Sequence, residues 1–192
     1  TFAAMEVVKS IVKKNGCFQM LYSDKAGIYG GGKRVNYTNM DRAMKELGII
    51  PIQANTPQAK GRIERLFKTL QDRLVSEMRL RGIDSLEEAN RYFNDEFISY
   101  YNNKFATQVP LNAYRRLDEQ IDLNEVFCLK EQRIVANGNL FSYNSKKYCL
   151  EARECLARKP IEIRLYPSGD MKAFVMGKEV VFTLLREHLK AA

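Results

Sequence analysis

Apolar side chains recur at steps of three and four over most of the first 117 residues, which is the spacing of helices that pack one face on a core. Two short apolar runs, CFQMLY and IIPIQA, interrupt this pattern and read as strands. The pattern predicts helices at residues 1–15, 39–47, 57–81, 86–101 and 112–117, and strands at residues 17–22 and 49–54. The longest helix is expected to bury one face, formed by Ile63, Leu66, Phe67, Leu70, Leu74 and Met78.

From residue 126 the period changes from helical to alternating, which is typical of half-buried strands. Asn137-Gly138 is a strong turn signal and predicts a hairpin between residues 133–135 and 140–143. Further strands are expected at residues 147–150, 161–166, 173–176 and 180–182, with a turn at residues 167–170. About five short strands in so few residues predict a small antiparallel barrel.

The composition narrows the class of protein. With 45% hydrophobic residues the chain can bury a core, and no apolar run approaches the roughly 20 residues that span a bilayer. No charged-then-apolar leader is present at the N-terminus. The four cysteines form no CxxC pair, and a single histidine excludes a zinc site that needs several. We therefore expect a reduced, intracellular protein without a membrane partner.

The net charge of +8 is unevenly distributed along the chain. The net charges are +4 for residues 1–55, +4 for 56–81, −5 for 82–125 and +5 for 126–192. Two basic regions thus flank an acidic one, and a polyanion such as DNA or RNA is the natural partner of the basic parts. A solvated lysine-rich surface is the alternative.

Two carboxylates stand out by position. Asp24 follows directly on the strand at 17–22, and Glu64 lies in the first turns of the helix at 57–81, where the helix dipole favours an anion. The cations around Glu64 are Lys60, Arg62, Arg65 and Lys68. Two such acids can hold magnesium through hard oxygen ligands, and the basic cluster favours phosphate binding. Without further context, Asp24 is explained as a strand-end aspartate that satisfies a loop amide. Glu64 is likewise explained as an exposed acid in helix i,i+4 pairs with Lys60 and Lys68.

The phrases LYSDKAGIYG and ELGIIPIQANTPQAKGRIERLFKTLQDRL resemble the second half of the DDE catalytic core of retroviral-type integrases and insertion-sequence transposases. TPQAKGRIER, at Thr56–Arg65, is the specific part of this match. The resemblance covers residues 1–117 and, more loosely, residues 126–182, where many such proteins carry a small barrel.

This resemblance implies an α/β fold, a partial ribonuclease-H-like integrase core, followed by a small antiparallel β-barrel of the Src-homology-3 type. The domains would be residues 1–117 for the core, 118–125 for a linker and 126–192 for the barrel. Asp24 matches the second metal-binding carboxylate, Glu64 the third, and Lys68 a basic residue that contacts DNA.

The activity implied is metal-dependent DNA cleavage and strand transfer, with Mg²⁺ or Mn²⁺ in a two-metal site of the intact protein. The implied partners are DNA, as transposon ends and target, and further copies of the chain in a homo-oligomer. The implied location is cytoplasmic, on prokaryotic nucleoid DNA.

The sequence departs from the family pattern in three places. The family's first carboxylate lies on a strand ahead of the helix at 1–15, whereas Glu6, the only acid before Asp24, lies within that helix. Lys25-Ala26 replaces the Asn-Gly that often follows the second aspartate, and 39 residues separate the two carboxylates, with the extra length expected at Gly30–Gly32. We therefore expect a fragment that cannot catalyse strand transfer as it stands.

Two other functions fit the residues. One is a non-catalytic DNA-binding module, a degenerate core plus barrel that binds through charge alone and loses affinity steeply with salt. The other makes the barrel a peptide-recognition module, with the helices serving for assembly.

Overall fold

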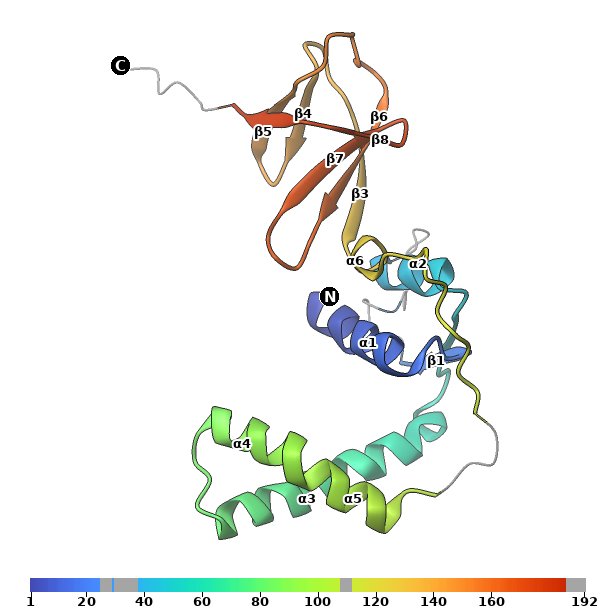
Figure 1. Cartoon of the computed structure of the whole chain (residues 1–192), viewed down its shortest axis with the longest axis vertical. Helices are drawn as coiled ribbons and strands as arrows, with labels where there is room; N and C mark the ends of the chain where they lie inside the picture. Colours follow the sequence, from blue (N-terminus) through green and yellow to red (C-terminus); the bar gives the residue numbers. More distant parts are fainter. Residues whose placement is uncertain (25–28, 30–37, 108–111, 186–192) are drawn as a thin grey trace.

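The computed structural model describes residues 1–24, 29, 38–107 and 112–185, and it shows a mixed α/β chain (Figure 1). The helices are α1 (Phe2–Asn15), α2 (Asn39–Glu46), η2 (Pro57–Lys60), α3 (Gly61–Leu80), α4 (Leu86–Tyr92), η3 (Phe93–Phe97), α5 (Ile98–Phe105) and α6 (Leu123–Val126). The strands are β1 (Met20–Ser23), β2 (Ile50–Gln53), β3 (Leu129–Ile134), β4 (Leu140–Tyr143), β5 (Lys146–Leu150), β6 (Pro160–Leu165), β7 (Met171–Val175), β8 (Lys178–Val180) and β9 (Phe182–Leu184). None of the helices in these residues is long and apolar enough to cross a membrane.

The N-terminal core forms where α1 and α2 pack together with the ends of β1 and β2. The predicted helices at 1–15 and 39–47 are confirmed, and the expected inner face of α2 is buried, with exposures of 0–2% for Met40, Ala43, Met44 and Leu47. Thr38 begins α2 with a reciprocal capping box, which satisfies two backbone donors. Glu6 lies in α1 and contacts Lys9, so it does not supply a carboxylate next to Asp24.

The two strands of this part form a parallel pair, in register from Met20↔Ile50 to Ser23↔Gln53. The apolar run at residues 17–22 suggests a buried strand, which is wrong for Met20 and Tyr22, because they are 54% and 52% exposed. Ile50 of β2 is 56% exposed, in keeping with the edge position that Pro51 favours. No other described strand pairs with them, so both outer edges of the pair are unpaired within the described part of the chain.

The predicted helix at 112–117 is wrong. Arg115 instead forms an antiparallel bridge with Cys17, and its guanidinium donates a hydrogen bond of 2.6 Å to the carbonyl oxygen of Leu47. Gly16 makes this close approach possible: it has φ +91°, and a Cβ there would lie 2.5 Å from the Arg115 carbonyl oxygen. Tertiary contacts thus override the local helical pattern of residues 112–117. The preceding residues 108–111 lie outside the described part.

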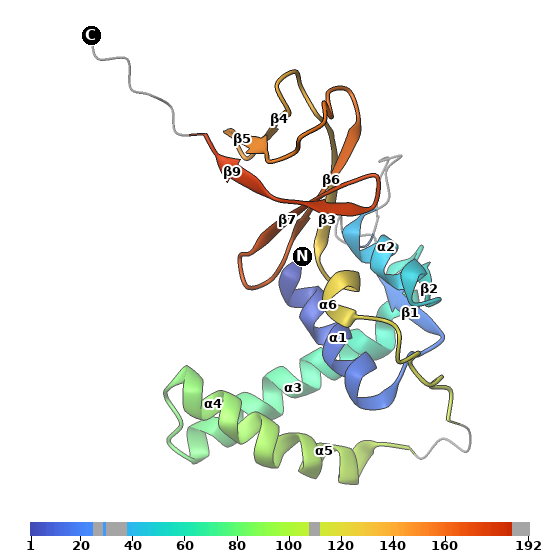
Figure 2. The same cartoon turned by 45° about the horizontal axis from the view of Figure 1, so that its top comes forward.

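Helices α3, α4, η3 and α5 form a long hairpin that projects away from the C-terminal sheets (Figures 1 and 2). The prediction that α3 buries one face is wrong, because no residue of α3 is buried and Ile63 and Phe67 are 46% and 56% exposed. Helices η3 and α5 lie against α3 near Leu66 and Leu70, and the stripe residues Leu66, Leu70, Leu74 and Met78 are half-buried. An amphipathic stripe predicts burial, but among the described residues its first turns, at Ile63 and Phe67, remain exposed.

The second arm of the hairpin, formed by α4, η3 and α5, is stabilised by contacts between aromatic rings. Ser85 caps it by accepting a hydrogen bond of 3.2 Å from the Glu88 amide, and the arm is divided by a π-helical turn, η3. Within the hairpin, Tyr92 and Phe97 are buried. Ring contacts at i,i+4 spacing follow the arm, with centroid distances of 6.1 Å for Phe93–Phe97, 5.9 Å for Phe97–Tyr101 and 4.7 Å for Tyr101–Phe105.

The C-terminal strands form two antiparallel sheets, in the orders β3-β6-β7-β8 and β4-β5-β9. They enclose one core, formed by Val135, Phe141, Tyr143, Leu150, Leu156, Ile161, Ile163, Ala173 and Val175. The predicted strand at 161–166 and turn at 167–170 are confirmed by β6 and by the bond from the Tyr166 amide to the Asp170 carbonyl oxygen.

The predicted turn at Asn137-Gly138 is confirmed, but the predicted pairing of residues 133–135 with residues 140–143 is wrong. Residues on the two sides of the turn meet in a single bridge, Ala136↔Leu140, and β3 pairs with β6 instead. Asn139 explains the redirection: it has φ 57°, and its side chain accepts a hydrogen bond from the Leu156 amide (2.7 Å) and donates one to the Glu154 carbonyl oxygen (2.9 Å). The chain is thereby tied to the segment after β5 rather than folded back on β3.

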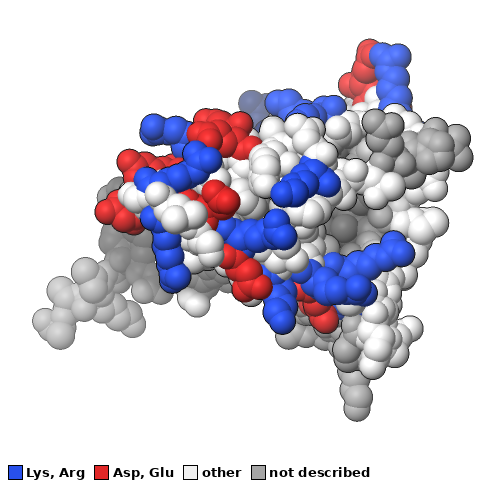
Figure 3. All heavy atoms as spheres, turned by 90° about the horizontal axis from the view of Figure 1, so that it is seen from below, with Lys and Arg blue, Asp and Glu red and all other residues white. Residues whose placement is uncertain are grey.

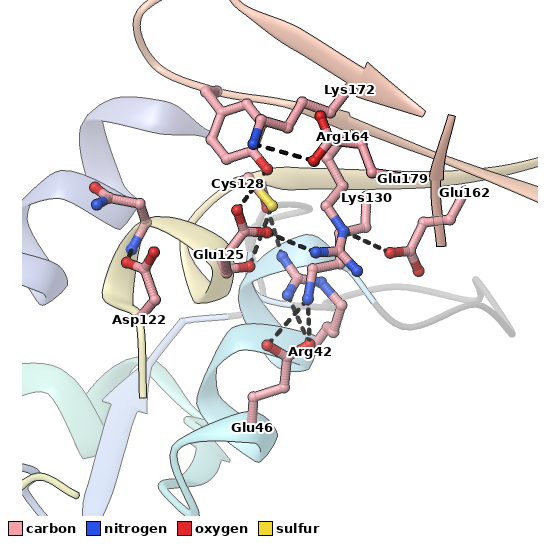
Figure 4. A network of polar contacts seen from close by, with 12 residues as sticks. Arg42, Glu46, Asp122, Glu125, Cys128, Lys130, Glu162, Arg164, Lys172 and Glu179 are labelled. Carbon is pink, nitrogen blue, oxygen red and sulfur yellow. Dashed lines mark hydrogen bonds and ion pairs between the residues drawn. The ribbon is translucent and has the colours of Figure 1, made fainter. Parts of the chain in front are cut away.

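A polar network joins the C-terminal sheets to α6 and α2 (Figure 4). Arg164 donates to Glu125 (2.6 Å) and Glu162 (2.7 Å), and Tyr166 donates to Glu125 (2.7 Å). Burial would raise the pKa of the Glu125 carboxyl, but the hydrogen bonds from Tyr166 and Arg164 outweigh it and hold this pKa below its ordinary value. Arg164 is therefore a structural cation.

On the α2 side of this network, the Lys130 ammonium pairs with Glu46 (2.9 Å) and the Lys130 amide donates to Asn39 Oδ1 (2.8 Å). Arg42 donates to the Cys128 carbonyl oxygen (2.5 Å). These contacts fix the start of β3 against α2, so residues 126–129 belong to the N-terminal core as well as to the sheets.

Candidate metal and nucleic-acid site

Asp24 lies at the carboxyl end of β1, beside the end of β2. The parallel register pairs Ser23 with Gln53, and the Ala54 amide donates a hydrogen bond of 2.8 Å to the Ser23 carbonyl oxygen. The two strands therefore end side by side, which is where open α/β sheets place functional groups. The chain leaving β2 turns into η2 within a few residues, so the start of α3 lies close to Asp24.

The sequence of this connection explains its turn. Thr56 is extended, with φ −133°, and Pro57 opens η2 with the backbone angle that suits a helix start. Gly61, the first residue of α3, has ordinary helical angles, and a Cβ there would meet no described atom within 4 Å. Packing among the described residues therefore does not require a glycine at this position of the TPQAKGRIER phrase.

Glu64 lies in the first turn of α3 and is exposed. The i,i+4 pairs with Lys60 and Lys68 that would give it a purely structural role are not seen: within the described ranges its carboxylate makes no ion pair. A helix N-terminus favours an anion there. Glu64 is thus a carboxylate on a rigid element that remains available to a ligand.

Lys60 binds Asp24 instead. Its Nζ lies 3.2 Å from Asp24 Oδ2, and the two side chains are 28% and 46% exposed. Of the predicted site residues, these two are in direct contact. The sequence predicts Lys60 as a member of the basic cluster but not this pair, because nothing in the spacing of residues 24 and 60 identifies them as neighbours.

The other cations of the cluster, Arg62, Arg65 and Lys68, are exposed on α3. Arg65 donates to the Gly61 carbonyl oxygen one turn earlier (3.2 Å), and none of the three pairs with an acid in the described part of the chain. Figure 3 views the molecule from the end formed by the helical hairpin, where Lys and Arg side chains are interleaved with acids. Charges that are not neutralised internally remain available for phosphates.

The donor set fits a hard divalent cation in kind but is incomplete. Asp24 and Glu64 offer carboxylate oxygens, which magnesium prefers, and the Lys60 ammonium already acts as a stand-in cation at Asp24. No group of three or more Asp, Glu, His or Cys side chains suited to a metal is found among the described residues. Lys25-Ala26 and Gly30–Gly32, where the sequence departs from the family pattern, lie outside them.

No protein-family model matches the chain. It is 33% identical over 180 residues, 88% of its length, to a protein of Sinorhizobium fredii (strain NBRC 101917 / NGR234) named "Putative transposase y4bF". It is 28% identical over 153 residues, 76% of its length, to a Streptococcus pneumoniae protein named "Transposase for insertion sequence IS1202". The chain is a homologue of proteins named transposases. It spans 39% and 33% of the lengths of these two relatives.

Proposed function

We propose that this chain is part of a DDE-type DNA transposase, with residues 1–117 as the later part of a ribonuclease-H-like core. Residues 118–125 then form a linker and residues 126–192 a Src-homology-3-like barrel. One observation carries the proposal: Asp24 ends a strand of a parallel pair, and α3, which bears Glu64, begins where the paired strand ends. Homology to two proteins named transposases supports it independently.

In this proposal Asp24 and Glu64 hold Mg²⁺ or Mn²⁺ together with a carboxylate from elsewhere in the intact protein. Such ions, when bound, activate an attacking oxygen and stabilise a leaving oxygen at phosphorus. The chain's own contribution is placement: β1 and α3 fix the two carboxylates, and Arg62, Arg65 and Lys68 line α3 with cations that hold the DNA phosphates.

The proposed partner is DNA, as transposon ends and target, and the proposed assembly is a homo-oligomer acting on nucleoid DNA inside the cell. Oligomerisation suits the half-exposed apolar residues of α3, such as Phe67, since apolar surface of this kind favours a covering partner.

The experiment is a strand-nicking assay on transposon-end DNA with the full-length transposase that contains this chain, in the presence of Mg²⁺. Glu64→Gln keeps the shape of the side chain and removes its charge, and we expect it to reduce nicking by at least about a hundredfold while DNA binding persists. Glu77→Gln, on the same helix, is the matched control and should leave nicking unchanged. Nicking by the Glu64→Gln variant at the unsubstituted rate would refute the catalytic assignment.

A non-catalytic DNA-binding module is the second candidate, and one observation favours it: no third carboxylate joins Asp24 and Glu64 in the described part of the chain. It predicts that neutralising either carboxylate only tightens DNA binding, since both then act as repulsive charges. It also predicts no magnesium-dependent nicking by the unsubstituted protein, so the same assay separates the two functions.

A further inference from the structure

The ion pair between Lys60 and Asp24 sets Lys60 apart from the rest of the basic cluster. Lys60 ends η2 and stands at the N-cap position of α3, so its backbone lies one helical turn before Glu64. Its ammonium lies 3.2 Å from Asp24 Oδ2. One lysine thus links the strand end that carries one carboxylate to the helix that carries the other.

The ammonium lies next to Asp24 Oδ2, an oxygen that a metal ion could also use as a ligand. A divalent cation and an ammonium that both contact one carboxylate oxygen repel each other, so the binding of one weakens the binding of the other. Lysine suits an exchange, since its charge sits at the end of a flexible four-carbon stem. The pair is also partly exposed, so water and ions can reach it.

We propose that Lys60 is an exchangeable cation: it neutralises Asp24 in the metal-free protein and passes to a DNA phosphate when a divalent ion takes the carboxylate. The inference rests on the proposed function and adds a regulation of that site. It gives Lys60 a different role from Arg62, Arg65 and Lys68, which have no acidic partner in the described part of the chain.

Exchange of this kind couples the two ligands. Metal binding releases the Lys60 ammonium for DNA, and DNA that holds this ammonium removes its competition with the metal at Asp24. By linkage, each ligand then raises the affinity for the other by the same factor. In the metal-free protein Lys60 is paired with Asp24, so the protein makes one phosphate contact fewer to DNA than it would if Lys60 were released.

The first test is a double-mutant cycle of DNA binding in EDTA, where Asp24→Asn imitates loss of the anion. In unsubstituted protein, Lys60→Met should change affinity less than twofold, because Lys60 is engaged by Asp24. In the Asp24→Asn background, Lys60→Met should lower the slope of log affinity against log salt by about 0.9, the value for one phosphate contact. Arg62→Met is the control and should lower the slope equally in both backgrounds.

The second test measures Mn²⁺ affinity by the electron paramagnetic resonance signal of the free ion, without DNA. Lys60→Met removes the competing cation and should raise the affinity about two- to fivefold, the range expected for loss of a partly exposed pair. Lys68→Met, which removes an equal charge two turns further along α3, should raise it less than Lys60→Met.

The outcomes separate the inference from the function on which it rests. An equal loss from Lys60→Met in both backgrounds, or an unchanged Mn²⁺ affinity, overturns the exchange while leaving a DNA-binding protein intact. Absence of salt-dependent DNA binding in every variant overturns the proposed function itself, and the Mn²⁺ measurement still decides whether Lys60 competes for Asp24.

Discussion

Phe97→Ala is the substitution that should separate the stability of the helical hairpin from that of the rest of the chain. Phe97 is 2% exposed, and its ring contacts those of Tyr92, Phe93 and Tyr101 at centroid distances of 5.9–6.1 Å. Truncating a buried Phe to Ala costs about 3–5 kcal/mol in free energy of unfolding. In the hairpin, residues 61–105, only Tyr92 and Phe97 are buried, so this loss exceeds what the remaining contacts can offset.

The expected result is local unfolding. Since about 1.4 kcal/mol corresponds to a tenfold change in an equilibrium constant, hydrogen exchange of amides in residues 61–105 should accelerate at least about a hundredfold. Exchange in residues 129–184 should stay the same, because their core is separate. Hydrogen exchange measured by mass spectrometry resolves both regions in one experiment.

Leu86→Ala is the control for this prediction, since Leu86 is 72% exposed and lies in the same hairpin. It should change exchange by less than about twofold. The reasoning is wrong if Phe97→Ala leaves residues 61–105 protected, or if the C-terminal sheets lose protection to the same extent, because either result means that the hairpin is not an independent unit of stability.

Three further substitutions test particular contacts. Gly16→Ala should lower the melting temperature by several degrees, because its Cβ would collide with a backbone oxygen, whereas Gly169→Ala, with the same φ of +91° but open space, should cost less. Asn139→Ala should cost about 2–4 kcal/mol in a urea titration, since it loses two hydrogen bonds and leaves an alanine at φ 57°. The lowered pKa of Glu125 means that its carboxylate stabilises the fold above pH 4.5 and that this is lost as pH falls below it. Glu125→Gln should therefore lower stability at pH 7 by about 1 kcal/mol and flatten its decline in acid.

The parts of the fold that were predictable are those fixed by local chemistry. Ser85 caps α4, as its position three residues before Glu88 indicates. The apolar face of α2 is buried because its spacing matches a helix that covers a core. The position of Asp24 at a strand end followed from the apolar run before it, although β1 begins at Met20 rather than at residue 17.

The errors arise where long-range contacts decide the structure. Asn137-Gly138 forms the turn that it predicts, but the strands on its two sides do not pair with each other. The hydrogen bonds of Asn139 to residues 154 and 156 hold the chain after the turn against the segment that follows β5. The stripe on α3 is a sound helical pattern, yet periodicity states which face is apolar and not whether another element covers it. The Lys60–Asp24 contact likewise depends on how two strands pair, and no local pattern encodes it.

The central claim is that Asp24 and Glu64 share one divalent ion, and paramagnetic broadening by Mn²⁺ tests it most directly. With substoichiometric Mn²⁺, the amide signals that broaden first should cluster at two places, residues 23–24 and residues 60–64, and Asp24→Asn or Glu64→Gln should each abolish both clusters. Broadening centred on the acidic residues 84–96, or broadening at one carboxylate that survives loss of the other, would contradict a shared site.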